Sequence, residues 1–136
     1  MTMPSPALAT LLVALGGGAG AAARYQLGRG MTHWLGAGAV TQFPWATLAA
    51  NAIGSLAMGL LAGWLAQRGA GGSDQLRLLL GVGLLGGFTT FSAFSLELVL
   101  LAQRGQIGLA ALYAFLSIAL GVAALVFGLT VMRVAA

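Results

Sequence analysis

Four long apolar segments, separated by short polar connectors, account for most of the 136-residue chain. They cover residues 4–24, 44–67, 78–103 and 106–132. A helix needs about 20 apolar residues, at about 1.5 Å each, to cross the roughly 30 Å hydrocarbon core of a bilayer, and each segment is long enough. We therefore predict an all-α membrane protein, a single domain of four transmembrane helices over residues 1–136, with the lipid bilayer as its surroundings.

Charged residues are too few for a protein that folds in water. Only 6% of the residues are charged, whereas a soluble domain carries roughly 25%, and 60% are hydrophobic. The net charge of +4 comes from scattered arginines without a basic run, so we expect no nucleic-acid partner. With no cysteine, one histidine and two carboxylates, the chain lacks the clusters that ordinary enzymes use, and we expect no catalysis. A multi-pass protein of the cell inner (plasma) membrane is the expected class.

The arginines divide equally between the two faces of such a bundle. One face carries Arg68, Arg77 and Arg133, and the other carries Arg24, Arg29 and Arg104. Because an arginine bias normally orients a membrane protein, the equal division favours insertion in both orientations and pairing as an antiparallel, dual-topology homodimer. The charges alone leave an alternative open, in which so small a count is noise and one arginine or the amino terminus sets the orientation.

Small residues recur every four positions on the first two predicted helices. They are Gly16 and Gly20 on the first, and Asn51, Ser55, Gly59 and Gly63 on the second. Residues four apart share one helix face, where small side chains let another backbone approach closely. This spacing predicts helix packing. One thin bundle cannot enclose a wide aqueous path, so transport by this chain would require an oligomer.

The third predicted helix contains GVGLLGGFTTFSAFSLE over residues 81–97, where glycines, hydroxyls and phenylalanines are concentrated. Two adjacent glycines weaken a helix by about 1 kcal/mol each relative to alanine, and two adjacent threonines can bond to nearby backbone. We therefore predict a break near the middle of this helix. Carbonyls exposed by such a break are suited to a small cation.

Polar groups at membrane depth are scarce and mostly neutral. They are Asn51, Ser55, Thr90, Ser95, Tyr113 and Ser117, with Glu97 near a helix end as the carboxylate. Phe91 and Phe94 share a helix face, and the positive edges of their rings can favour an anion. Neutral donors without a deep acid suit an anion pathway. Interhelical hydrogen bonds and aromatic core packing are the structural alternatives.

These segments closely resemble the Fluc family of fluoride channels, also called CrcB proteins, across nearly the whole chain. The resemblance rests on GGGAGAAARY (16–25), NAIGSLAMG (51–59), GGFTTFSAFSLE (86–97), and the pair Tyr113 and Ser117. It implies an antiparallel dual-topology homodimer with two fluoride pores and a structural sodium ion at the centre of the interface. The implied activity is passive fluoride conduction that lowers cytoplasmic fluoride and gives fluoride resistance.

The resemblance also implies residue roles. The pore residues are Asn51, Phe91, Phe94, Thr90, Ser92, Tyr113 and Ser117; the carbonyls of Gly86 and Thr89 hold Na⁺; Arg24 and Glu97 lie toward the vestibules. Two positions depart from the family pattern, because Gly121 and Ala93 stand where many relatives have a hydroxyl. The first shortens the polar track on the fourth helix or leaves it to water, and the second removes a possible hydroxyl.

Two rival functions differ from fluoride conduction in what they require. A small dual-topology multidrug or cation exporter would place an acid within the membrane, usually early in the chain, and residues 4–23 contain none. A membrane assembly protein that transports nothing needs only the small-residue ridges. It leaves the cluster over residues 86–94 unexplained.

Overall fold

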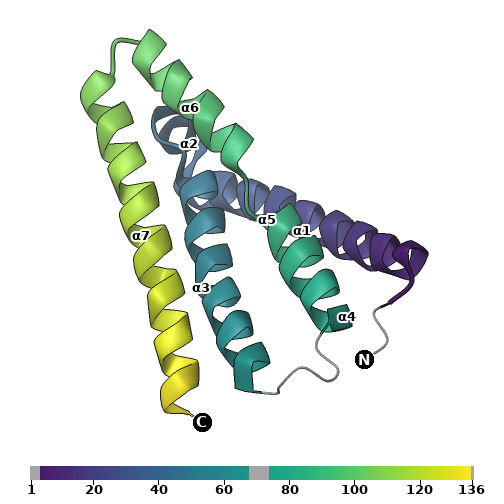
Figure 1. Cartoon of the computed structure of the whole chain (residues 1–136). Helices are drawn as coiled ribbons and strands as arrows, with labels where there is room; N and C mark the ends of the chain where they lie inside the picture. Colours follow the sequence, from purple (N-terminus) through teal and green to yellow (C-terminus); the bar gives the residue numbers. More distant parts are fainter. Residues whose placement is uncertain (1–3, 68–73, 136) are drawn as a thin grey trace.

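The computed structural model describes residues 4–67 and 74–135, and these residues are helical apart from short connectors. In chain order the elements are α1 (Pro6–Leu35), α2 (Ala37–Gln42), α3 (Trp45–Gln67), α4 (Asp74–Leu76), the π-helical η1 (Arg77–Leu85), α5 (Gly86–Phe88), α6 (Phe91–Gln103) and α7 (Ile107–Val134). Four helical spans are long and apolar enough to cross a membrane, the third running from Asp74 to Gln103. The predicted all-α protein with four membrane-spanning helices is confirmed (Figure 1).

The first helix is longer than the sequence analysis predicts. Ser5 begins it by accepting a hydrogen bond from the Leu8 N–H, and Pro6 occupies the first helical position. The helix does not end at Arg24 but continues to Leu35, where Gly36 with a φ of 83° ends it. Most of the connector expected after Arg24 is therefore helical, since proline is absent until Pro44. At about 45 Å, α1 exceeds the hydrocarbon thickness, and it crosses α3 at a steep angle in Figure 1.

Two pairs of helices are joined through glycines, as the four-residue spacing predicts. A Cβ added at Gly59 would overlap the Leu125 carbonyl oxygen of α7, and one at Gly63 would lie 2.6 Å from the Met132 Cβ. On the other pair, a Cβ at Gly16 or at Gly20 would overlap carbonyl oxygens of η1. The α3–α7 and α1–η1 contacts therefore depend on the absence of side chains at these positions.

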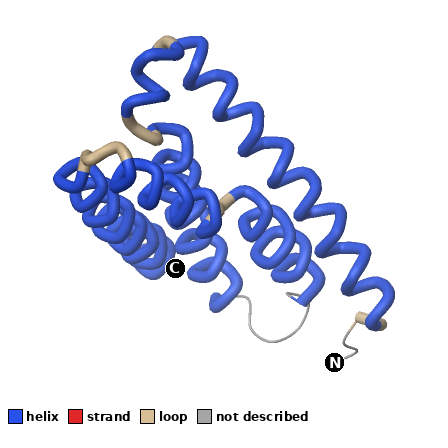
Figure 2. The backbone as a smooth tube through the Cα atoms, turned by 90° about the horizontal axis from the view of Figure 1, so that it is seen from above, coloured by secondary structure: helices blue, strands red, loops and turns tan. Residues whose placement is uncertain are grey.

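Two threonines separate the halves of the third span. Thr89 (φ −84°, ψ 159°) and Thr90 (φ −151°, ψ 124°) are extended, so α5 ends at Phe88 and α6 begins at Phe91. The short loop between them is visible in Figure 2. Gly86 and Gly87, which the sequence analysis considered weak points, are helical.

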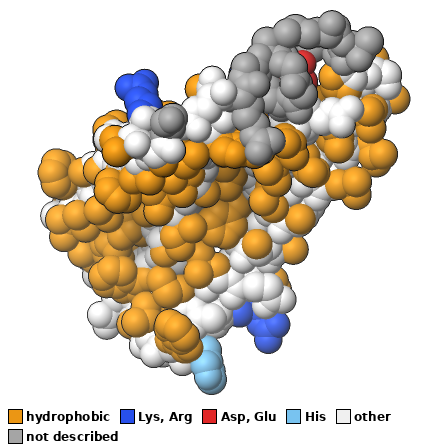
Figure 3. Space-filling view, turned by 90° about the horizontal axis from the view of Figure 1, so that it is seen from below, with side chains coloured by type: hydrophobic (Ala, Val, Ile, Leu, Met, Phe, Trp, Pro, Cys, Tyr) orange, Lys and Arg blue, Asp and Glu red, His pale blue; other side chains and the backbone are white. Residues whose placement is uncertain are grey.

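Apolar side chains cover most of the face seen in Figure 3, while charged groups and the histidine lie toward its periphery. Large exposed residues include Leu15, Ile53, Phe115 and Phe127, each more than half exposed. Such a surface is costly in water but matches hydrocarbon, which agrees with a membrane location. Of the six arginines counted above, Arg68 lies outside the described residues.

Candidate ion pathway

The Asn51 side chain holds the extended residues between α5 and α6. Its Oδ1 accepts a hydrogen bond from the Thr90 backbone N–H at 2.8 Å, and its Nδ2 donates to the Thr90 carbonyl at 3.1 Å. One side-chain amide thus pairs with both backbone groups of Thr90, and it gives the N–H the acceptor that the interrupted helix does not supply. Two residues assigned to the pore from the sequence, Asn51 and Thr90, are in direct contact.

This arrangement redirects two backbone donors that a continuous helix would use. In an α-helix the Thr90 N–H would donate to the Gly86 carbonyl and the Ala93 N–H to the Thr89 carbonyl. Here the Thr90 N–H donates to Asn51, and the Ala93 N–H donates to Thr90 Oγ1 at 3.2 Å. The carbonyls of Gly86 and Thr89 therefore lose their regular helical donors.

The two phenylalanines of α6 are neighbours but differ in their surroundings. Their ring centroids are 5.8 Å apart at an interplanar angle of 45°. Phe94 is half-buried and packs against Tyr113, with centroids 5.2 Å apart. Phe91 is 79% exposed. Most of its ring is therefore left uncovered by the rest of the described chain.

Glu97 lies at the centre of a buried hydroxyl cluster. Its Oε1 accepts a hydrogen bond from Thr47 Oγ1 and its Oε2 accepts one from the Tyr113 hydroxyl, both at 2.7 Å. Thr47 is 8% exposed and Tyr113 is fully buried. Thr47 was missed from the sequence, although it lies four residues before Asn51 and so continues the ridge of small and polar residues on α3.

The remaining predicted hydroxyls lie on both sides of this cluster. Ser117 Oγ, one turn beyond Tyr113 on α7, is buried and has no hydrogen-bond partner among residues 4–67 and 74–135. Thr90 Oγ1 and Ser92 Oγ are 3.4 Å apart. The Ser95 hydroxyl is used within its own helix, since its Oγ donates to the Phe91 carbonyl.

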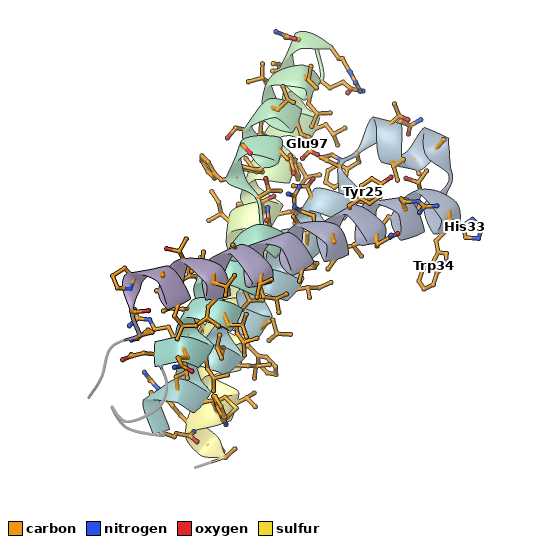
Figure 4. The ribbon with its side chains drawn as sticks, turned by 90° about the vertical axis from the view of Figure 1, so that its right-hand side faces the viewer. Tyr25, His33, Trp34 and Glu97 are labelled. Atoms are coloured by element: carbon orange, nitrogen blue, oxygen red, sulfur yellow. The ribbon has the colours of Figure 1, made fainter. Side chains whose placement is uncertain are left out.

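Two cavities meet at Glu97. The larger, about 930 Å³, lies between α1, α2, α3 and α6 and is lined by Arg24, Arg29, His33 and Glu97 among others. The smaller, about 290 Å³, reaches Glu97 from the side of Arg104. Arg24 is anchored through its Nε, which donates to the Gly87 carbonyl at 3.4 Å. Figure 4 shows Glu97 above α1, with Tyr25 and His33 farther along that helix.

The fold and this site define a multi-pass membrane protein in which neutral donors, two aromatic rings and one carboxylate surround the α5–α6 junction. No group of three or more His, Cys, Asp or Glu side chains able to hold a metal occurs within the described ranges. Residues 11–129 match the family model described as CrcB-like protein, Camphor Resistance (CrcB). The chain belongs to this family, as the sequence resemblance predicted.

Curated relatives match over nearly the whole chain. A protein of Erythrobacter litoralis is 61% identical over 132 residues, which is 97% of this chain and 96% of the relative. One of Novosphingobium aromaticivorans is 61% identical and one of Phenylobacterium zucineum 55% identical, each covering 92% of this chain and 96% and 95% of the relative. All three carry the name fluoride-specific ion channel FluC, which is not an enzyme name. With four spanning helices, these bacterial relatives indicate a multi-pass protein of the plasma membrane.

Proposed function

We propose that the protein is a fluoride-selective ion channel that conducts fluoride passively and thereby lowers cytoplasmic fluoride. The observation that carries this proposal is 61% identity, over 97% of the chain, to a relative named as a fluoride-specific channel. The site supports it, because neutral donors and aromatic edges can replace part of the water that a small anion loses. No specific observation favours the exporter or the assembly protein.

In the proposed pathway, fluoride enters the larger cavity, passes Arg24 and reaches the cluster around Glu97. Beyond it, the Ser117 hydroxyl offers a free donor, and Phe91 and Phe94 offer ring edges. Asn51 has two amide hydrogens, of which one is used on the Thr90 carbonyl, so the second can face the ion. Tyr113, Thr90 and Ser92 complete the polar lining.

The working unit we propose is an antiparallel, dual-topology homodimer. Phe91 supports this, because its exposed ring needs a covering surface to form part of an enclosed path. The equal division of the arginines supports the antiparallel arrangement, although Arg68 lies outside the described residues. A second copy also gives the two pores their remaining walls.

A sodium ion is the proposed structural partner at the centre of this dimer. The Gly86 and Thr89 carbonyls fit such an ion, because their regular helical donors are redirected to Asn51 and Thr90. Unwound carbonyls are established ligands for Na⁺ in membrane proteins. Gly86 is exposed on the subunit surface, so its carbonyl segment is open to a partner. Two carbonyls from each subunit would provide four oxygen ligands.

A fluoride-electrode assay on liposomes tests the function. Purified protein is reconstituted into vesicles loaded with potassium fluoride, and efflux is started with valinomycin in the absence of any pH gradient. A channel should release fluoride rapidly and retain chloride in matched vesicles. A proton-coupled exporter would require a pH gradient, and an assembly protein would release no fluoride beyond that of protein-free vesicles.

A further inference from the structure

The part of α1 beyond Arg24 forms one wall of the larger cavity. Arg29 and His33 both line this cavity, and they lie four residues apart on one face of the helix. His33 lies at the outer end of α1 in Figure 4, whereas Arg24 is anchored farther in on the Gly87 carbonyl. Basic side chains therefore line the cavity from its inner end to its outer end.

Positive charge outweighs negative charge in this cavity. Glu97 is the acidic residue that lines it, and both of its carboxylate oxygens accept hydrogen bonds, from Thr47 and Tyr113. The cavity-lining residues of α2 and α3 carry no charge, and the remaining titratable side chain on α1 is the phenol of Tyr25. Arg29 and His33 are exposed, so the Arg29 charge faces the aqueous mouth.

We propose that the outer part of α1, with Arg29 and His33 on one face, forms an outer wall whose arginine charge concentrates fluoride at the mouth of the pathway. The inference rests on the proposed fluoride conduction. Rows of basic side chains are a common way to favour anions at a pore. The outer wall acts on fluoride through its electrostatic field and does not need to bind the ion in a fixed geometry.

The expected effect is modest and depends on salt. A unit charge about 10 Å from the mouth changes the local anion concentration roughly twofold in water. Because the Debye length falls from about 10 Å at 0.1 M to about 3 Å at 1 M salt, the effect should disappear at high ionic strength. A residue that influences the fluoride current only through packing would show no dependence on ionic strength.

The charge at Arg29 can be removed and restored in one variant, since the natural chain has no cysteine. We expect Arg29→Cys to reduce the single-channel fluoride current in dilute salt by about half. Modification with a cationic methanethiosulfonate should restore the current, and an anionic reagent should lower it further. Gln26→Cys is the matched control, because Gln26 is exposed on α1 but does not line the cavity. Neither reagent should change the fluoride current of Gln26→Cys.

The salt dependence is tested by recording single-channel fluoride currents of the wild type and of Arg29→Cys in dilute salt and at 1 M salt. The wild-type current should exceed the variant current about twofold in dilute salt and should match it at 1 M salt. Equal currents in dilute salt, or currents of fully modified Arg29→Cys that ignore the sign of the reagent, would overturn the proposal. A wild-type protein with no fluoride current would instead overturn the proposed function.

Discussion

The side-chain amide of Asn51 and the backbone of Thr90 close a pair of hydrogen bonds across two helices, at 2.8 Å and 3.1 Å. The Asn51 amide replaces the helical acceptor that the Thr90 N–H has lost and adds a second donor to the Thr90 carbonyl. The Gly86 and Thr89 carbonyls are left without their usual donors. The proposed fluoride pathway and the proposed cation site therefore both depend on the Asn51 side chain.

Replacing Asn51 with alanine should damage both stability and conduction. The change removes the acceptor of the partly buried Thr90 N–H, and an unpaired N–H costs about 1–3 kcal/mol. We expect a lower temperature of aggregation in detergent and little or no fluoride efflux from liposomes. Thr130→Ala is the control, because the Thr130 hydroxyl is exposed and bonds only to the Val126 carbonyl of its own helix. An Asn51→Ala protein with wild-type stability would contradict the proposed anchoring role.

Changing either phenylalanine of α6 to isoleucine should abolish fluoride efflux while leaving the protein folded and dimeric. Isoleucine keeps much of the apolar volume but has no ring edge with positive potential. Phe115→Ile and Phe127→Ile are matched controls, since both rings are exposed on α7 outside the cluster. Efflux is measured with a fluoride electrode and the dimer by size-exclusion chromatography. Undiminished efflux in both Phe91→Ile and Phe94→Ile would refute the assignment of the ring edges.

Glycine packing between α1 and η1 predicts a sharp difference between neighbouring positions. A Cβ at Gly20 would overlap the Leu84 carbonyl oxygen, whereas one at Gly18 would meet nothing within 4 Å. Gly20→Ala should therefore destabilise the protein by about 1–3 kcal/mol. Gly18→Ala should be neutral or slightly stabilising, because alanine favours helix by about 1 kcal/mol over glycine. Thermal aggregation monitored by fluorescence-detected chromatography compares the two, and equal melting temperatures would argue against this packing.

The sequence was most informative where its patterns were long. Hydropathy predicted the four spans, and the four-residue spacing predicted the faces of Gly16, Gly20, Gly59 and Gly63. It was least informative about single contacts. Thr47 was missed because a lone threonine near a helix start is common, and its bond to Glu97 joins residues 50 positions apart. The end of α1 was misplaced because hydropathy marks where a helix leaves the membrane, whereas the helix itself continues until a residue such as Gly36 ends it.

Removing sodium should weaken the dimer and stop conduction, and Asn51 should control how strongly sodium acts. Because Asn51 draws the Thr90 N–H away from the Gly86 carbonyl, it keeps that oxygen free for a cation. Replacing Na⁺ with N-methyl-D-glucamine should therefore lower both the dimer fraction and the fluoride flux of the wild type. In Asn51→Ala, the sodium concentration that gives half of the thermal stabilisation should rise, since the Thr90 backbone is no longer held in the position that exposes the Gly86 carbonyl. Lithium and potassium titrations separate a specific ion from a general salt effect. If wild-type stability and flux stayed unchanged without sodium, the carbonyls of Gly86 and Thr89 would not be holding the ion.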